Sequence, residues 1–182
     1  MRGASEDLRA LAAGRLLARR NARAGLLDFT QYTYPQYVAD PVHALIASTL
    51  DRVVAGELTR LMIFAPPQHG KSELTSVRLP AFWLGQRPDD PVILTSYGAT
   101  LAESKSRQVR DILIGDEFRA LFGDLAPVDE PVQLRPDSRA VARWQLAGHR
   151  GAMLAVGVGD RVTAHGAQLG IIDDPFENCE QA

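Results

Sequence analysis

The sequence has one cysteine and no long apolar run, and each shortage excludes a class of protein. Cys179 stands alone among 182 residues, which excludes an internal disulfide framework and is typical of a reducing compartment. No apolar stretch approaches the roughly 18 residues that a membrane-spanning helix needs. The charged N-terminus also lacks the apolar core of a secretory signal. We therefore expect a cytoplasmic protein.

The sequence also lacks a strong excess of either charge. Its net charge of −2 does not indicate wholesale coating of nucleic acid, although it leaves room for local basic patches. One such patch is expected at residues 6–24, where Leu8, Leu11, Arg15 and Arg19 follow helical spacing. The basic face of this helix is either a solvated surface or an arm that contacts DNA or a partner.

Apolar and polar segments alternate along the rest of the chain in the manner of an α/β protein. With 46% hydrophobic residues, 182 residues are enough for one such domain with a sizeable core. Helices are expected at 41–55, 71–84, 99–114 and 116–122, and strands at 60–65, 92–96, 139–146, 151–158 and 169–172. This alternation predicts a mostly parallel sheet flanked by helices. We expect an N-terminal helical arm over 1–28 and a single domain over 29–182.

A phosphate-binding pattern follows the first expected strand. Residues 65–72 read Ala-Pro-Pro-Gln-His-Gly-Lys-Ser, close to the Walker A pattern G-x-x-x-x-G-K-[ST]. In that pattern Gly70 allows close approach of the backbone, Lys71 reaches the β- and γ-phosphates, and Ser72 places its hydroxyl on Mg²⁺. Backbone N–H groups at the start of the following helix would hold phosphate oxygens.

The loop departs from the general pattern at its start. Ala65 stands where the first glycine is expected, and Pro66 and Pro67 provide no N–H donors. The alternatives are a rigid loop of different shape and a tight turn with Lys71 in solvent. If the loop binds nucleotide, the contacts are expected from Gln68, His69, Gly70, Lys71, Ser72 and Glu73.

A pair of carboxylates follows the last apolar run. Asp173 and Asp174 come directly after residues 169–172, which is the pattern of a Walker B strand that ends in acidic residues. Asp173 fits a Mg²⁺ ligand, and Asp174 fits a general base that orients water. Glu177 is a rival for the base, and simple strand termination with helix capping is the structural alternative. Because ligands of parallel sheets bind at the carboxyl ends of strands, residues 65–72 and 173–174 are expected to lie side by side.

Other polar and aromatic residues are weaker candidates for contacts with a nucleotide. An aromatic loop is expected from Phe29 to Tyr37. Its Tyr32, Tyr34 and Tyr37, with Gln31 as a polar reader, could flank a nucleotide base. A cation for the transferred phosphoryl group could come from a group of four basic residues that otherwise are ordinary surface charges, namely Lys105, Arg107, Arg110 and Arg161. The histidines show no metal-ligand spacing.

Several segments together resemble one family, the large terminase subunit of tailed bacteriophages and prophages, in its N-terminal ATPase part. The resemblance covers the chain from about Phe29 to its end. It rests on residues 66–73, on Thr95-Ser96-Tyr97 with Leu101-Ala102 and Ser106-Arg107 to Arg110, and on Gly157-Val158-Gly159 leading to residues 171–175. The prolines and the missing glycine, which are unusual for the general motif, are ordinary in this family.

The resemblance implies an ASCE-type, RecA-like P-loop ATPase that uses ATP and Mg²⁺ to drive double-stranded DNA into a procapsid. It implies a homo-oligomeric ring at the portal protein and a small terminase subunit as partners. By position, Lys71 and Ser72 bind phosphate and Mg²⁺, Asp173 is the metal-binding acid and Asp174 is the catalytic acid. Many relatives have arginine at the place of Gln68, so a charge-stabilising arginine in cis is missing here.

The family usually continues into an RNase H-like nuclease domain, for which no residues follow Ala182. We therefore assign no DNA cleavage to this sequence and expect an incomplete domain, either a fragment or a truncated product of a decaying prophage. Two alternatives stay open. One is another P-loop ATPase of helicase-like type, and the other is a prophage remnant without activity.

Overall fold

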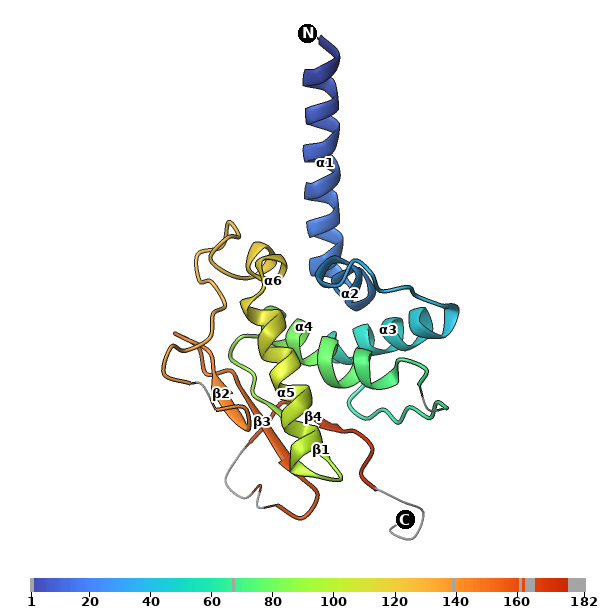
Figure 1. Cartoon of the computed structure of the whole chain (residues 1–182), viewed down its shortest axis with the longest axis vertical. Helices are drawn as coiled ribbons and strands as arrows, with labels where there is room; N and C mark the ends of the chain where they lie inside the picture. Colours follow the sequence, from blue (N-terminus) through green and yellow to red (C-terminus); the bar gives the residue numbers. More distant parts are fainter. Residues whose placement is uncertain (1, 67, 139, 161, 163–165, 177–182) are drawn as a thin grey trace.

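The computed structural model describes residues 2–66, 68–138, 140–160, 162 and 166–176, and Figure 1 shows how their elements are arranged. The helices are α1 (Arg2–Ala24), α2 (Leu26–Thr33), α3 (Pro41–Val54), the π-helical segment η1 (Glu73–Arg78), α4 (Leu79–Gln86), α5 (Ala99–Ile114) and α6 (Asp116–Leu121), and the strands are β1 (Val92–Ser96), β2 (Arg143–Gln145), β3 (Ala152–Gly157) and β4 (Leu169–Ile172).

A four-stranded, mostly parallel sheet forms the framework of the fold. Its strand order is β2-β3-β1-β4. The central strand β1 runs parallel to both neighbours, with Leu94 opposite Ala155 of β3 and Ile171 of β4. β2 pairs with β3 in an antiparallel hairpin and is shorter than the predicted 139–146 segment. The predicted α/β class, with a mostly parallel sheet flanked by helices, is confirmed.

One hydrophobic core joins the sheet to the helices. Leu94, Met153 and Ile171 from three neighbouring strands pack in the same buried cluster as Trp83 of α4 and Val109 of α5. These side chains alternate with less buried ones along β1, β4 and the first half of β3, because successive residues of a strand point to opposite faces. The cluster fixes where the carboxyl ends of β1 and β4 lie.

The helix after the expected phosphate loop begins as predicted and contains a π-helical stretch. Helical backbone runs from Lys71 to Gln86, and η1 begins at its third residue, Glu73, and ends at Arg78. The Leu79 N–H donates to the carbonyl of Leu74, five residues earlier. Pro80 follows and has no N–H to donate, so an irregular hydrogen-bond pattern is tolerated here.

The expected strand at 60–65 is wrong. No strand is present between residues 59 and 66, although the apolar sequence of this segment predicted a buried strand. Met62 is 78% exposed and Phe64 is 87% exposed. A strand is formed by pairing, and β4, the edge strand of the described sheet, pairs only with β1. The apolar composition of residues 60–65 does not show whether a neighbouring strand is present to pair with them.

A second correction concerns Phe29, which we expected in an aromatic loop. It lies in α2, and its ring is completely buried. Its ring centroid is 5.2 Å from that of Phe82 and 6.3 Å from those of both Phe118 and Phe122, so one residue ties α2 to α4 and α6. The start of α2 is capped by Asp51 of α3, whose Oδ1 accepts the Leu26 N–H at 2.8 Å. A cap from 25 residues away has no local sequence signal.

The cap at Asp51 gives a stability prediction. Burial raises the pKa of the Asp51 carboxyl, the Leu26 N–H opposes this rise, and the charge of Asp28 adds to it. We expect Asp51→Ala to lower the free energy of unfolding by about 1–2 kcal/mol, because it removes the cap. Asp51→Asn keeps an acceptor oxygen without the buried charge, so its stability at pH 7 should equal or exceed that of the unchanged protein.

The pH dependence of this difference has a definite sign. A raised folded-state pKa means that Asp51 favours the folded state more as the pH falls through that pKa, with the full effect below about 3.9. Any advantage of Asp51→Asn should therefore shrink as the pH is lowered, as measured by urea unfolding. An asparagine variant as unstable as the alanine variant would contradict this role.

Helix α1 projects from the body of the protein, as Figure 1 shows. The described side chains from Asp7 to Ala18 are all exposed, and the helix first enters the core at Ala22. The C-terminal part of α1 is bound to α2 by the Arg19 Nε, which donates to the Tyr32 hydroxyl at 3.2 Å. Within the residues that the structure describes, no helix combines the length and apolar character that crossing a membrane requires.

Candidate active site

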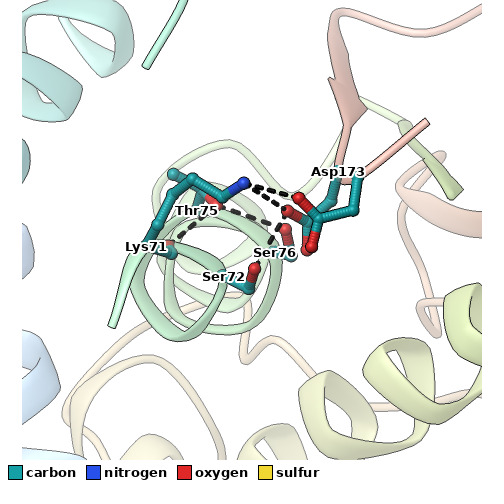
Figure 2. Close-up of polar contacts among 6 residues, drawn as sticks. Lys71, Ser72, Thr75, Ser76 and Asp173 are labelled. Atoms are coloured by element: carbon teal, nitrogen blue, oxygen red, sulfur yellow. Dashed lines mark hydrogen bonds and ion pairs between the residues drawn. The ribbon is translucent and has the colours of Figure 1, made fainter. Parts of the chain in front are cut away.

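The loop at 65–72 and the carboxylates at 173–174 lie side by side. Figure 2 shows Lys71 and Ser72 at the start of the π-helical turn, facing Asp173 at the end of β4. The Lys71 Nζ donates to Asp174 Oδ1 at 2.7 Å and lies 3.7 Å from Asp173 Oδ1. About one hundred residues separate the two segments in the chain, and the parallel sheet brings them together because β4 ends beside the helix that follows the loop.

A second hydrogen bond joins the side chains of Ser72 and Asp173. The Ser72 hydroxyl donates to Asp173 Oδ1 at 2.9 Å. The Asp173 side chain is only 3% exposed, whereas that of Asp174 is 55% exposed. The buried acid is thus held in place by a hydroxyl and a nearby ammonium group, and the exposed acid faces solvent. This difference in burial matches the different chemistry expected of a metal ligand and of a base that contacts water.

Electrostatics in the site favour a charged lysine. The hydrogen bond to Asp174 raises the pKa of Lys71, and burial opposes it, while the charges of Asp174 and Asp173 add to the rise. The ammonium group is therefore cationic at any physiological pH. Together with the two acids it forms a compact cluster in which a single cation faces two anions.

The backbone around the site adopts conformations that are uncommon outside glycine. Gln68 has φ of 63°, Gly70 has φ of 70° and Asp174 has φ of 46°. Left-handed backbone is readily adopted by glycine, is tolerated by aspartate and is costly for most other residues. Such outliers in folded proteins cluster at ligand-binding and catalytic sites. The sequence predicted the glycine requirement at Gly70 but gave no sign of the strain at Gln68.

His43 supports the loop from α3, and our sequence interpretation missed it. Its Nδ1 accepts the Asp40 N–H at 2.9 Å, so the proton of the neutral ring lies on Nε2, which contacts the His69 carbonyl at 3.2 Å. A Cβ on Gly70 would come 2.7 Å from the same Nε2. The Asp40-Pro41 signal predicted the helix start. Only the folded chain shows that this helix also holds the loop.

A cavity of about 590 Å³ is lined by the loop and by Asp174, whereas Asp173 is not among its lining residues. Its walls come from the loop, the first helical turn, the end of β1 and the segment after β4, and the described lining residues are Ala65, Pro66, Gln68, His69, Gly70, Lys71, Ser72, Glu73, Tyr97, Asp174, Pro175 and Phe176. The size is typical of ligand pockets. Among these described residues Lys71 is the one lysine or arginine, so cationic charge is concentrated at a single point.

Glu73 lines the cavity but its carboxylate is already engaged. Its Oε1 accepts the Arg78 Nε at 2.7 Å, and Arg78 also donates to the Thr33 hydroxyl at 3.0 Å. Arg78 is only 8% exposed and lies over the Tyr34 ring. This network fixes η1 against α2, so Glu73 has a structural contact in addition to its place in the expected binding loop.

The weaker sequence candidates do not line this cavity. Tyr37 packs against His43 with a centroid distance of 5.6 Å, while Gln31 and Tyr32 line a separate cavity beneath α1. None of the basic residues Lys105, Arg107 and Arg110 is among the described lining residues. Arg161, His165, Glu177 and Cys179 lie outside the described residues, so the structure does not distinguish Glu177 from Asp174 as the base.

The described residues hold no cluster of three or more His, Cys, Asp or Glu side chains suited to a metal ion. A divalent cation at this site would therefore take few ligands from the protein, here Ser72 and Asp173, and the rest from water and a bound ligand. Mg²⁺ is commonly bound in this way beside phosphate groups, since it keeps several waters. The two oxygen atoms fit that preference.

Comparison with known proteins adds no relative. No protein-family model, no curated protein and no solved structure matches the chain.

Proposed function

We propose that this chain is a Mg²⁺-dependent ATPase with a RecA-like P-loop fold, and that it is the motor part of a phage terminase large subunit. The observation that carries the ATPase proposal is the meeting of Lys71 and Ser72, at a helix start, with Asp173 and Asp174, at a strand end. Lys71, Ser72 and Asp174 line one cavity, and Asp173 contacts the Ser72 hydroxyl beside it. Few structural roles require a lysine, a hydroxyl and two acids in this arrangement.

The residues divide the chemistry of phosphoryl transfer among them. Lys71 binds the β- and γ-phosphates, and the helix N-terminus adds backbone N–H donors. Ser72 and Asp173 hold Mg²⁺, which would neutralise charge that develops on the phosphoryl oxygens. Asp174 orients the attacking water and accepts its proton. Because the Lys71 ammonium group bonds Asp174, a phosphate that binds Lys71 would have to replace this bond before the acid can act.

Lys71 is the one lysine or arginine among the described residues that line the cavity. We infer that a second positive charge for the transition state comes from a residue outside this group. Gln68 cannot provide it. A subunit ring of the kind the family resemblance implies would allow a neighbouring copy to contribute an arginine, as arginine fingers do in other ATPases. We therefore expect slow turnover by the isolated chain. Double-stranded DNA, the portal protein, a small terminase subunit and a location in the host cytoplasm belong to the same proposal and rest on the resemblance alone.

The decisive experiment compares the unchanged chain with Lys71→Ala. We expect the unchanged protein to hydrolyse ATP in the presence of Mg²⁺, and ATP with Mg²⁺ to raise its thermal unfolding temperature by mass action. Lys71→Ala should lose both effects. The control is Lys105→Ala, which removes a lysine that does not line the cavity. Equal turnover by the Lys71 and Lys105 variants would refute the ATPase assignment.

The support of the loop by His43 gives a further prediction about nucleotide affinity. Loss of the contact to the His69 carbonyl should weaken ATP binding about fivefold, the effect of one hydrogen bond worth about 1 kcal/mol. His43→Gln can place an amide nitrogen near the position of Nε2 and should bind ATP nearly as well as the unchanged protein. His43→Asn is too short to reach the loop and should show the full loss in equilibrium binding. Equal affinities for the two variants would argue against a role of His43 in holding the loop.

A further inference from the structure

The Asp173 carboxylate is held by two groups that the proposed function would engage elsewhere. The Ser72 hydroxyl donates to its Oδ1 at 2.9 Å, and the Lys71 ammonium group lies 3.7 Å from the same oxygen. With ATP and Mg²⁺ bound, Ser72 would turn its hydroxyl to the metal ion and Lys71 its ammonium group to phosphate. The Asp173 side chain is only 3% exposed, so little solvent reaches it. Because a buried charge is costly without hydrogen bonds, such a site needs another donor beside Asp173.

Ser96 provides a buried donor without a partner. It is the last residue of β1, it is completely buried, and its Oγ has no hydrogen-bond partner among the described residues. Most buried hydroxyls in native proteins are paired, and an exception needs an explanation. Four side-chain atoms in the described part of the chain are buried without a partner, and of these the Ser96 Oγ is the one on a strand that pairs with β4.

The strand register places Ser96 next to Asp173. β1 and β4 are parallel, with Thr95 opposite Ile172. The Asp173 N–H donates to the Thr95 carbonyl at 2.9 Å, which continues this register by one residue and brings Asp173 opposite Ser96. Neighbouring strands lie about 4.8 Å apart. Ser96 and Asp173 are buried whereas Ile172 is 72% exposed, so the serine and aspartate side chains share the inner face of the sheet.

Ser76 is another buried hydroxyl in this region, but its proton is already used. Figure 2 draws Ser76 within the same group of polar contacts as Asp173. The Thr75 hydroxyl has a single proton, which it donates to the Lys71 carbonyl at 2.9 Å. In the contact of 3.2 Å between Thr75 Oγ1 and Ser76 Oγ, the donor is therefore Ser76. Of the two buried serines, Ser96 is the one whose proton is free.

We propose that Ser96 is a positioning residue, whose hydroxyl donates to the Asp173 carboxylate when Ser72 and Lys71 contact the bound nucleotide and its metal ion. Ser72 and Lys71 both approach Oδ1, so the acceptor for Ser96 is Oδ2. The hydroxyl fixes the direction of the Asp173 side chain, as residues behind metal ligands commonly do. This role rests on the proposed ATPase function.

The experiment measures thermal unfolding of the full 182-residue chain with and without a non-hydrolysable ATP analogue, over a titration of Mg²⁺. We expect the analogue with Mg²⁺ to raise the unfolding temperature of the unchanged protein by mass action. In Ser96→Ala, the Mg²⁺ concentration at the midpoint of this rise should be about tenfold higher, the usual effect of losing a group that orients a metal ligand. Without the analogue, Ser96→Ala should unfold at the same temperature as the unchanged protein or higher, because the lost hydroxyl has no partner.

Two further variants separate the hydrogen bond from other effects. Ser96→Cys keeps the shape of the side chain but is a weak donor, so its Mg²⁺ midpoint should follow that of Ser96→Ala. Thr95→Val removes a hydroxyl from the preceding residue, which faces the other side of the sheet. Its Mg²⁺ midpoint should equal that of the unchanged protein.

The possible failures of this inference and of the ATPase proposal are distinguishable. If Ser96→Ala and Ser96→Cys kept the Mg²⁺ midpoint of the unchanged protein, the inference would be wrong and the ATPase proposal would stand. A lower unfolding temperature of both variants without the analogue would assign the hydroxyl a structural role instead. An equal shift in Thr95→Val would remove the assignment to Ser96. If the analogue with Mg²⁺ did not stabilise the unchanged protein, the proposed function would fail and the inference with it.

Discussion

Asp173→Asn is expected to lower Mg²⁺-dependent ATP turnover by about a thousandfold. Asparagine keeps the size of the side chain and an oxygen that can accept the Ser72 hydroxyl, so the contact at 2.9 Å can persist. What is lost is the negative charge that would hold Mg²⁺ under the proposed function. A bound metal ion contributes several kcal/mol of charge stabilisation in the transition state, which corresponds to about three orders of magnitude in rate. Steady-state hydrolysis measured across a Mg²⁺ titration tests this.

The control for this variant is Asp124→Asn. Asp124 forms an exposed ion pair with Arg119 at 2.8 Å and does not line the cavity. Surface pairs of this kind contribute little to stability, so turnover and unfolding should change little. If Asp173→Asn turned over ATP with an unchanged Mg²⁺ dependence, Asp173 would not be the metal ligand, even if Lys71→Ala were inactive.

Phe29→Ala is expected to lower the free energy of unfolding by about 3–5 kcal/mol, which is the usual cost of deleting a buried phenylalanine ring. The ring is fully buried and contacts three other phenylalanine rings, so the surrounding side chains cannot easily fill the space. The loss is a large part of the 5–15 kcal/mol by which most domains are stable. Urea unfolding followed by circular dichroism measures it.

The matched control changes the same residue type at an exposed position. Phe64 is 87% exposed, so Phe64→Ala should change the free energy of unfolding by less than about 0.5 kcal/mol. Phe29→Leu keeps much of the apolar volume and should fall between the two alanine variants. A small effect of Phe29→Ala would mean that the aromatic cluster does not connect α2 to the rest of the core.

Sequence patterns predicted the elements whose signals are local. Helix α5 has the predicted bounds, because its apolar spacing is regular and Gly98 and Gly115 flank it. β1 and β4 were likewise predicted by short apolar runs between turn residues. The segment 60–65 has an equally apolar sequence and is not a strand. The difference lies in pairing, which depends on what occupies the neighbouring position and cannot be read from the segment itself.

The residues of the candidate site also divide into those with a local sequence motif and those without one. Glycine, lysine and serine at fixed spacing predicted the loop, and two acids after an apolar run predicted its counterpart; the contacts of Lys71 and Ser72 place them together. His43 and Arg78 have no such pattern, since each contacts a residue that is distant in the sequence, His69 in one case and Thr33 in the other. Supporting residues of this kind are found only when the folded chain shows which neighbours they have.

The bond between Lys71 and Asp174 joins the proposed phosphate ligand to the proposed base. Under the proposed function, a phosphate that reaches Lys71 would draw its ammonium group away from Asp174 and free this carboxylate to orient water. A nucleoside or a shorter phosphate chain that does not reach Lys71 would leave the bond intact. Recognition of the terminal phosphate and activation of water would then be a single step.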